Sequence, residues 1–220
     1  MRKIIVSTFA SLDGVMQAPG GPEEDPTSGF TEGGWSFSYW DEVMNNTMGE
    51  SMGKPFDLLL GRKTYEIFAA HWPYAGDNPI TAVFNKATKY VATHTLDKAD
   101  WVNTKLLRGD IAAEVKRLKQ DDGPELQVHG SSNLLQTLTA AHLIDEYHVW
   151  IFPVLLGKGK RLFELDTAPQ GLSLAATKTS TTGVLLTVYK PAGALKAGTF
   201  GLDAPSQAEL ARREKMAREG

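Results

Sequence analysis

Residues 57–64 read Asp-Leu-Leu-Leu-Gly-Arg-Lys-Thr, an apolar strand that ends at a glycine and passes at once into a helix-forming sequence. Residues 125–133 repeat this arrangement, because another apolar segment ends at Gly130 and a helix is expected from Ser131. Parallel strands need crossover connections, and a strand that runs directly into a helix is the usual unit of such a sheet. The two segments therefore predict an α/β fold.

The rest of the chain extends this alternation of strands and helices. The expected strands are residues 3–10, 57–60, 89–93, 125–128 and 146–156, and the expected helices are residues 38–52, 63–72, 110–119 and 131–143. Near the end, residues 173–179 and 184–189 flank Thr182-Gly183, a sequence typical of a hairpin. We predict a mostly parallel central sheet with flanking helices and a C-terminal antiparallel hairpin.

Length and composition fit one domain with a tail. The chain has 220 residues, of which 42% are hydrophobic and 22% charged, close to the globular average. We place the domain at residues 1–191. Residues 192–220 are rich in alanine, glycine and charge, with a weak helical pattern at 206–219, and are expected to form a tail of low order.

Composition also excludes several classes of protein. The net charge is −3 and the basic residues are scattered, so no nucleic-acid partner is expected. The chain has no cysteine and its five histidines lack metal-ligand spacing, so we expect no disulfide, no thiolate catalysis and no metal. The apolar run near the N-terminus is too short for a signal peptide or a membrane span, so a cytoplasmic protein is expected.

Three strand ends carry small or hydroxylic residues, at the edge where open α/β sheets bind ligands. A helix N-terminus offers free N–H groups and a partial positive charge, both of which favour phosphate. The candidate residues are Gly61, Arg62, Lys63 and Thr64 at the first strand end, Gly130, Ser131, Ser132 and Asn133 at the second, and Thr93, His94 and Thr95 at the third. Two glycine turns in one sheet suggest a dinucleotide, although each alone also fits an ordinary capped turn.

Residues 157–162 read Gly-Lys-Gly-Lys-Arg-Leu and begin like a dinucleotide fingerprint. They lack the final glycine, and they follow the fifth expected strand instead of opening a βαβ unit, so we reject that interpretation. The sequence also contains no Walker motif and no Gly-x-Ser-x-Gly motif.

Four segments together resemble dihydrofolate-reductase-like proteins. Residues 4–14 are similar to the first strand and loop of that superfamily, residues 60–66 to its first cofactor helix, and residues 128–135 to its second pyrophosphate loop. Residues 152–163, Phe-Pro-Val-Leu-Leu-Gly-Lys-Gly-Lys-Arg-Leu-Phe, resemble the reductase domain of the riboflavin-biosynthesis deaminase–reductase more than dihydrofolate reductase itself. The resemblance covers roughly residues 3–190.

This resemblance implies an NADPH-dependent reductase that forms a homodimer and acts on a small heterocycle. It places the first strand end at the adenosine side of NADPH, the second at the pyrophosphate and the third at the 2′-phosphate, with Ala10 and Gly14 beside the nicotinamide. Related pyrophosphate loops often carry Gly-Gly where this chain has His129-Gly130, and related 2′-phosphate sites often carry arginine where it has His94. Because neutral histidine binds a dianion less well than a guanidinium, the preference for NADPH rests on the resemblance.

Two acidic residues are candidates for the proton donor that reduction of a C=N or C=O bond requires. Asp13 comes directly after the first strand, where the resemblance places the nicotinamide and the substrate. Asp41 lies roughly where dihydrofolate reductases place their pterin-binding acid. Asp41 also has a structural alternative, because an acid near a helix N-terminus is stabilising.

Aromatic residues in and after the long loop at 17–34 are candidates for substrate contacts. Trp35 is the candidate lid. Phe37, Tyr39 and Trp40 are candidates to stack on a flat heterocycle, with the core or an interface as the alternative and the core favoured for Trp40. We also assign Leu156 and Gly157 to the substrate site.

Three interpretations of function stay open. The first is a reductase similar to 5-amino-6-(5-phosphoribosylamino)uracil reductase, acting on that pyrimidine or on another pyrimidine- or pterin-like heterocycle. The second is dihydrofolate reductase, which residues 153–163 disfavour, and the third is a non-catalytic nucleotide-binding module, favoured if Asp13 lies far from the nicotinamide. The chain lacks the His-x-Glu and Cys-x-x-Cys motifs of the zinc deaminases, so it is not the bifunctional enzyme.

Overall fold

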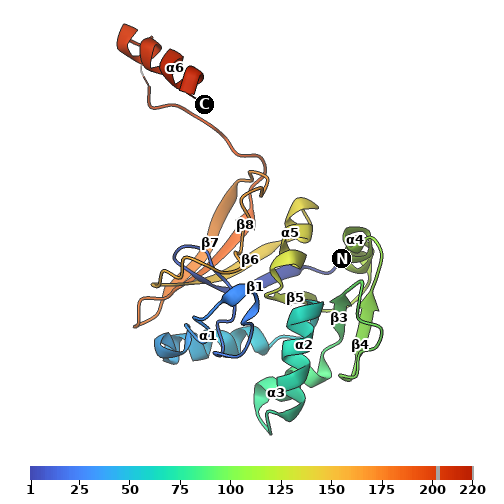
Figure 1. Cartoon of the computed structure of the whole chain (residues 1–220). Coiled ribbons are helices and arrows are strands. Elements are labelled where there is room, and N and C mark those ends of the chain that lie inside the picture. The colour runs from blue at the N-terminus through green and yellow to red at the C-terminus, as the bar shows by residue number, and fades with distance from the viewer. Residues whose placement is uncertain (202–203, 220) are drawn as a thin grey trace.

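The computed structural model describes residues 1–201 and 204–219 and contains an eight-stranded sheet of order β4-β3-β2-β5-β1-β6-β8-β7 (Figure 1). The strands are β1 (Ile4–Ser11), β2 (Phe56–Gly61), β3 (Lys89–Ala92), β4 (Thr104–Leu107), β5 (Glu125–His129), β6 (Glu146–Phe152), β7 (Leu172–Thr179) and β8 (Leu185–Pro191). The first six strands pair in parallel, whereas β8 runs antiparallel to both β6 and β7. The predicted α/β fold with a C-terminal antiparallel hairpin is confirmed.

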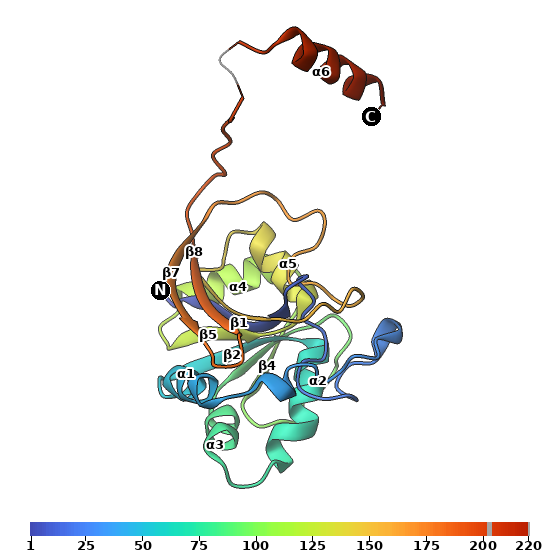
Figure 2. The same cartoon turned by 90° about the vertical axis from the view of Figure 1, so that its left-hand side faces the viewer.

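Helices cover both faces of this sheet. The covering helices are α1 (Glu42–Met52), α2 (Arg62–His71), α3 (Pro79–Lys86), α4 (Ile111–Gln120) and α5 (Ser132–Ala140). A further helix, α6 (Gln207–Glu219), follows the sheet, and short 3-10 turns lie at Thr27–Gly29, Phe37–Tyr39 and Trp72–Tyr74. α4 and α5 pack on one face, and α1, α2 and α3 pack on the other (Figure 2). This three-layer arrangement is what right-handed crossovers between parallel strands produce.

Strand β2 shows why both faces need a cover. Leu58, Leu59 and Leu60 are all fully buried, and successive side chains of a strand point to opposite faces. Leu59 belongs to the core under α4 and α5, whereas Leu58 and Leu60 belong to the core under α2 and α3. An unbroken apolar run is therefore the sequence signature of this central strand.

Two elements, α3 and β4, were not predicted from the sequence. α3 begins at Pro79 and is capped by Asn78, whose side chain accepts a hydrogen bond of 2.9 Å from the N–H of Thr81. Asn-Pro is a recognisable helix start, but the helix has only eight residues. β4 has four residues and lies at the sheet edge, too short to give a periodic pattern.

The first helix begins later than predicted. Ser38 lies in a 3-10 turn, and Asp41 is the N-cap of α1. One oxygen of the Asp41 carboxylate accepts a hydrogen bond of 2.9 Å from the N–H of Met44. The other accepts hydrogen bonds from the N–H (2.7 Å) and the hydroxyl (2.8 Å) of Thr181, in the turn between β7 and β8. Asp41 thus fastens α1 to the hairpin.

The C-terminal segment extends away from the sheet. α6 has no buried residue and lies apart from the other elements in both views (Figures 1 and 2). The helix agrees with the weak helical pattern at 206–219. A helix that buries no face does not need a strong amphipathic pattern. Residues 202, 203 and 220 of the predicted tail lie outside the described residues. Within the described part, no helix has the length and apolar character that a membrane span requires.

Met44 is expected to contribute more to stability than any exposed methionine. Its side chain is fully buried beside Trp150 and Phe152. Met44→Ala should lower the free energy of unfolding by about 2–5 kcal/mol, because it loses transfer free energy and leaves a cavity. Urea unfolding measures the change. Met216→Ala, at a position in α6 that is 58% exposed, is the control, and equal midpoints for the two variants would contradict this packing.

Candidate functional site

A cavity of about 760 Å³ opens where β1, β2, β3 and β5 approach their carboxyl ends. Open α/β sheets bind ligands at this edge, and the volume lies within the range of cofactor and substrate sites. The wall has three parts: two helix N-termini, an acidic segment of the loop after β1, and a group of apolar side chains.

The first part is formed by the N-termini of α2 and α5, which follow the neighbouring strands β2 and β5. Neither helix has a side-chain cap at its N-cap residue, Gly61 for α2 and Ser131 for α5. The first N–H groups of a helix have no partner inside the helix, and the helix dipole adds a partial positive charge there. Two such ends on one cavity make a site for an extended anion.

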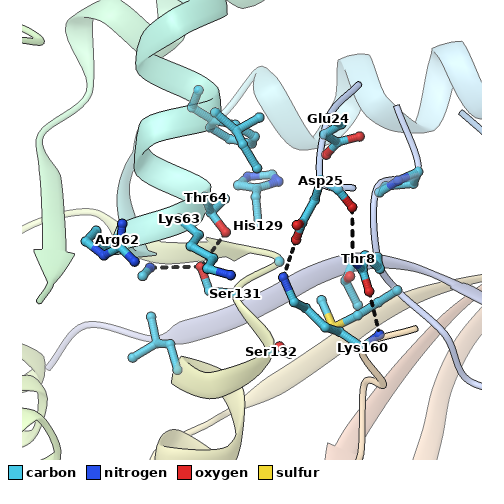
Figure 3. A pocket seen from close by; sticks show the side chains of 18 of the residues that line it. Thr8, Glu24, Asp25, Arg62, Lys63, Thr64, His129, Ser131, Ser132 and Lys160 are labelled. Carbon is cyan, nitrogen blue, oxygen red and sulfur yellow. Dashed lines mark hydrogen bonds and ion pairs between the residues drawn. The ribbon is translucent and has the colours of Figure 1, made fainter. Parts of the chain in front are cut away.

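Ser131 connects these two helix ends (Figure 3). Its hydroxyl accepts a hydrogen bond of 2.8 Å from the N–H of Gly61 and donates one of 2.6 Å to the hydroxyl of Thr64. A Cβ on Gly61 would lie 3.0 Å from the Cβ and Oγ of Ser131. Any larger residue at 61 would press on Ser131, so this glycine serves the contact between the two helix ends and not only the approach of a ligand that the sequence suggested.

Gly130 is the glycine that leaves space in the cavity. Its φ is +76°, in the left-handed region, and a Cβ placed there would meet only the ends of Met16 and Thr64, at 3.8 and 3.9 Å. Ser131 follows with φ +70°, so two consecutive residues adopt left-handed conformations before α5. These two residues carry the chain from β5 into α5, whose N-terminus borders the cavity.

The third strand end borders the same cavity. Thr93 is buried, and its hydroxyl accepts hydrogen bonds from the N–H groups of Thr95 (3.2 Å) and Leu96 (2.9 Å), so it shapes the turn. His94 is exposed beside it. The position of this turn next to the α2 N-terminus places a histidine at one end of the cavity.

The cations of the cavity wall are mostly paired. Arg62 forms an ion pair of 2.8 Å with Glu66, and the ammonium of Lys160 pairs with the Asp25 carboxylate and donates a hydrogen bond of 3.0 Å to Thr27. Lys63 has no hydrogen-bond or ion-pair partner among residues 1–201 and 204–219, and it borders the cavity from the first turn of α2 (Figure 3).

Glu24 gives the second part of the wall its acidic character. One carboxylate oxygen accepts hydrogen bonds from the N–H groups of Gly20 (2.6 Å) and Gly21 (3.2 Å). Burial raises the pKa of Glu24, and the neighbouring charge of Asp25 acts in the same direction, against the two backbone hydrogen bonds. A carboxyl group in such surroundings holds its proton at higher pH than an exposed one.

The third part, called here the apolar lobe, comes from β1, α1, α2 and α3 and the segments beside them. It consists of Phe9, Trp40, Met48, Met52, Phe68, Trp72, Ile80 and Phe84. Several of these side chains contact one another, such as Phe68 and Phe84, whose rings stack 5.7 Å apart, and Trp72 and Phe84 at 4.9 Å.

His129 is the polar residue next to this lobe, with its ring 5.6 Å from the ring of Phe84. Burial lowers the pKa of His129 to about 4, so the imidazole is neutral at pH 7. Its Nε2 lies 3.0 Å from the side-chain oxygen of Gln127, and the side-chain amide of Gln127 donates a hydrogen bond of 2.9 Å to Glu125.

Comparison with known proteins identifies the family. The model of the RibD C-terminal domain matches residues 2–186. The chain belongs to the RibD C-terminal domain family. The resemblance expected from the sequence is therefore confirmed. Two curated relatives come from Bacillus subtilis (strain 168). The uncharacterized protein YyaP is 27% identical over 86% of this chain and 94% of YyaP. The uncharacterized protein YwjB is 27% identical over 80% of this chain and 91% of YwjB.

Solved structures agree on the fold. A putative riboflavin biosynthesis protein from Shewanella sp. PV-4 has a TM-score of 0.57 at 19% identity, covering 87% of this chain and 99% of its own. Dihydrofolate reductase from Enterococcus faecalis, complexed with NADP(H) and RAB-propyl, has a TM-score of 0.56 at 15% identity. This match covers 86% of this chain and 96% of the reductase. A pyrimidine reductase-like protein from Corynebacterium diphtheriae has a TM-score of 0.53 at 12% identity. This match covers 89% of this chain and 93% of that protein. The predicted dihydrofolate-reductase-like fold is thus confirmed for this RibD C-terminal domain.

The predicted anion-binding residues of the three strand ends all border the cavity. The structure brings together Gly61, Arg62, Lys63, Thr64, Thr93, His94, Thr95, Gly130, Ser131, Ser132 and Asn133. Ala10 and Gly14 do not line it: Ala10 is buried in the core, and Gly14 lies in the turn after β1, near the guanidinium of Arg161.

Neither predicted proton donor lines the cavity. Asp13 turns toward the segment after β6, where it accepts hydrogen bonds from the N–H groups of Leu156 (3.1 Å) and Gly157 (2.7 Å) and from the hydroxyl of Ser11 (2.6 Å). The Ser11 hydroxyl, with these N–H groups, lowers the pKa of Asp13 to about 2. Such a carboxylate is ionised at pH 7 and has no proton to give. Asp41 is occupied as the cap of α1 and by Thr181.

The predicted substrate residues also lie elsewhere. Trp35 packs edge-on against Phe152 at 5.2 Å and donates a hydrogen bond of 2.8 Å to the carbonyl of Gln17, so it secures the loop. Phe37 is 83% exposed. Leu156 and Gly157 form the turn that Asp13 holds, away from the cavity.

The roles of Glu24 and of His129 next to the lobe were not predicted from the sequence. Trp40 was expected in the core but is 37% exposed and borders the cavity. The signal for Glu24 was the length of the loop, which indicated function without indicating which of its acidic residues points inward. His129 stood out in the sequence as a departure from Gly-Gly, but only the surrounding rings reveal its role.

Proposed function

We propose that this RibD C-terminal domain is an NADPH-dependent reductase that acts on a pyrimidine- or pterin-like heterocycle. The observation that carries the proposal is the pair of uncapped helix N-termini, those of α2 and α5, on one cavity. Two linked phosphoryl groups match two adjacent positive helix ends. The similarity to a dihydrofolate reductase solved with NADP(H) supports the same cofactor class.

The residues at the three strand ends fit such a cofactor. The free N–H groups that begin α5, after the open space at Gly130, would hold the pyrophosphate together with Lys63 and Thr64. The turn with His94 would hold the 2′-phosphate. When bound, the nicotinamide supplies the hydride.

Glu24 is the residue to which we assign the proton. One of its carboxylate oxygens is fixed by the N–H groups of Gly20 and Gly21, and the other has no hydrogen-bond partner within the described residues. That second oxygen holds the proton and donates it to a heteroatom of the substrate. The raised pKa keeps this carboxyl in the acid form to higher pH than an exposed glutamate.

A nucleotide-binding module without catalysis is the second candidate. The observation that favours it is the placement of Asp13 and Asp41 away from the cavity. It predicts cofactor binding with no NADPH oxidation against any heterocycle of a screen that includes 5-amino-6-(5-phosphoribosylamino)uracil, pterins and dihydrofolate. Oxidation with any of these would exclude it.

Titration with NADPH and NADH, followed by tryptophan fluorescence, tests the proposal. Trp40 and Trp72 border the cavity, so a ligand there should quench them. We expect saturation by NADPH at lower concentration than by NADH. If the folded protein binds neither nucleotide at millimolar concentration, the reductase proposal is wrong.

His94→Arg is expected to tighten NADPH binding about tenfold and to leave NADH binding unchanged. A guanidinium is always charged and can bind the 2′-phosphate through two hydrogen bonds, worth roughly 1.4 kcal/mol more than the contact of an imidazole. The same fluorescence titration measures both constants. An equal gain for NADH would show that position 94 does not face the 2′-phosphate.

A further inference from the structure

The apolar lobe leaves large side chains incompletely covered inside the cavity. Phe68, Trp72 and Ile80 are only half-buried, although each belongs to the cluster under α2 and α3. Apolar surface left facing a cavity is stabilised when an apolar ligand covers it. Their aromatic rings suit a flat ring system, which can stack against them or meet them edge-on.

The charges of the wall disfavour an anion at this lobe. The cations of the cavity are Arg62, paired with Glu66, Lys160, paired with Asp25, and Lys63 at the α2 N-terminus. Glu24 adds a carboxyl without a cation partner among the described residues. Lys63, which has no partner among the described residues, belongs to the first turn of α2, whereas Phe68 and Trp72 lie at the other end of that helix. A phosphate in the lobe would lose its hydration and find no cation among the lobe residues, which is costly.

His129 supplies one directed polar contact. Its Nε2 faces an oxygen of Gln127, an assignment supported by the amide of Gln127 donating to Glu125. The proton of the neutral ring is therefore on Nε2, and Nδ1 is an acceptor. Nδ1 has no hydrogen-bond partner within residues 1–201 and 204–219, so it is available to a ligand N–H or O–H.

From these three observations we infer that the apolar lobe binds the substrate as a flat, uncharged ring that carries no phosphate and donates one hydrogen bond to Nδ1 of His129. The inference rests on the proposed function and narrows its substrate class. It favours unphosphorylated heterocycles over a phosphoribosyl pyrimidine. The anionic part of the cavity is left to the cofactor.

Three naphthalene probes separate the parts of this inference. 1-Naphthol is flat and neutral and has one O–H donor, 1-methoxynaphthalene lacks the donor, and 1-naphthyl phosphate adds the dianion. Dissociation constants are measured by calorimetry on the full chain, with saturating inorganic pyrophosphate to occupy the helix N-termini. We expect 1-naphthol to bind about fivefold tighter than the methyl ether and at least about tenfold tighter than the phosphate ester.

Two variants at His129 check the directed contact. His129→Asn keeps an acceptor near the position of Nδ1 and should preserve the preference for 1-naphthol over its methyl ether. His129→Leu removes the acceptor and should abolish the preference, while binding of the ether persists. Thermal melting confirms that both variants fold, and the wild-type comparison of the three probes stands without them.

Two results would overturn the inference. One is that the wild-type protein binds the phosphate ester as tightly as 1-naphthol or more tightly. The other is that it does not bind 1-naphthol at millimolar concentration. An NADPH titration of the same preparation keeps the two proposals distinct. Failure of NADPH to bind contradicts the cofactor assignment alone, whereas the probe series addresses the lobe.

Discussion

Gly61→Asp is expected to weaken NADPH binding by at least about a hundredfold. A Cβ at this position would lie 3.0 Å from the side chain of Ser131, so Ser131 must move and its hydrogen bonds to Gly61 and Thr64 are disturbed. The new carboxylate would also stand at the N-terminus of α2 and repel phosphate. Steric and electrostatic effects act in the same direction, and fluorescence titration measures their sum.

Gly49→Asp is the matched control for this variant. Gly49 lies on the exposed side of α1, and a Cβ there meets nothing within 4 Å. The control adds the same charge away from the cavity and should bind NADPH as the wild type does. If Gly61→Asp melts like the wild type and still binds NADPH normally, the cofactor does not lie across these helix ends.

Glu24→Gln is expected to lower kcat by about a hundredfold to a thousandfold once a substrate is known, with NADPH binding unchanged. The amide keeps the shape of the side chain but has no acidic proton. In the wild type the protonated carboxyl is the active form, so kcat should fall as the pH rises through the raised pKa of Glu24. The variant should lack this alkaline decline.

Two further variants make the test of Glu24 specific. Glu23→Gln changes the adjacent exposed residue, which is outside the cavity wall, and should leave kcat unchanged. Asp13→Asn tests the role that the sequence suggested for that residue. Loss of turnover in Asp13→Asn together with normal turnover in Glu24→Gln would contradict the assignment made here.

The fold could be predicted because its decisive signals are local. The unbroken leucines of β2 and the glycine that follows them lie next to each other in the chain, and the same holds for β5 and Gly130. The predicted anion-binding residues border the cavity for the same reason, since a strand end and the helix after it are placed together by the backbone. α3 and β4 are too short to give such a signal.

The proton donor and the substrate contacts could not be predicted in this way, because they depend on the path of loops. Asp13 follows β1 directly, yet its carboxylate turns to the N–H groups of Leu156 and Gly157, far away in sequence. Glu24 differs from Glu23 only in facing the cavity, which the fold of the loop decides. Burial keeps the imidazole of His129 neutral, and the contact of its Nε2 with the oxygen of Gln127 leaves Nδ1 as the acceptor.

The central claim is that a nicotinamide dinucleotide binds across the N-termini of α2 and α5. A crystal structure of the protein with NADPH tests it most directly. We expect the pyrophosphate at the backbone N–H groups of Ser132 and Asn133, beside Lys63, and the 2′-phosphate near His94. NADPH bound at another surface, or a pyrophosphate remote from both helix ends, would contradict the account.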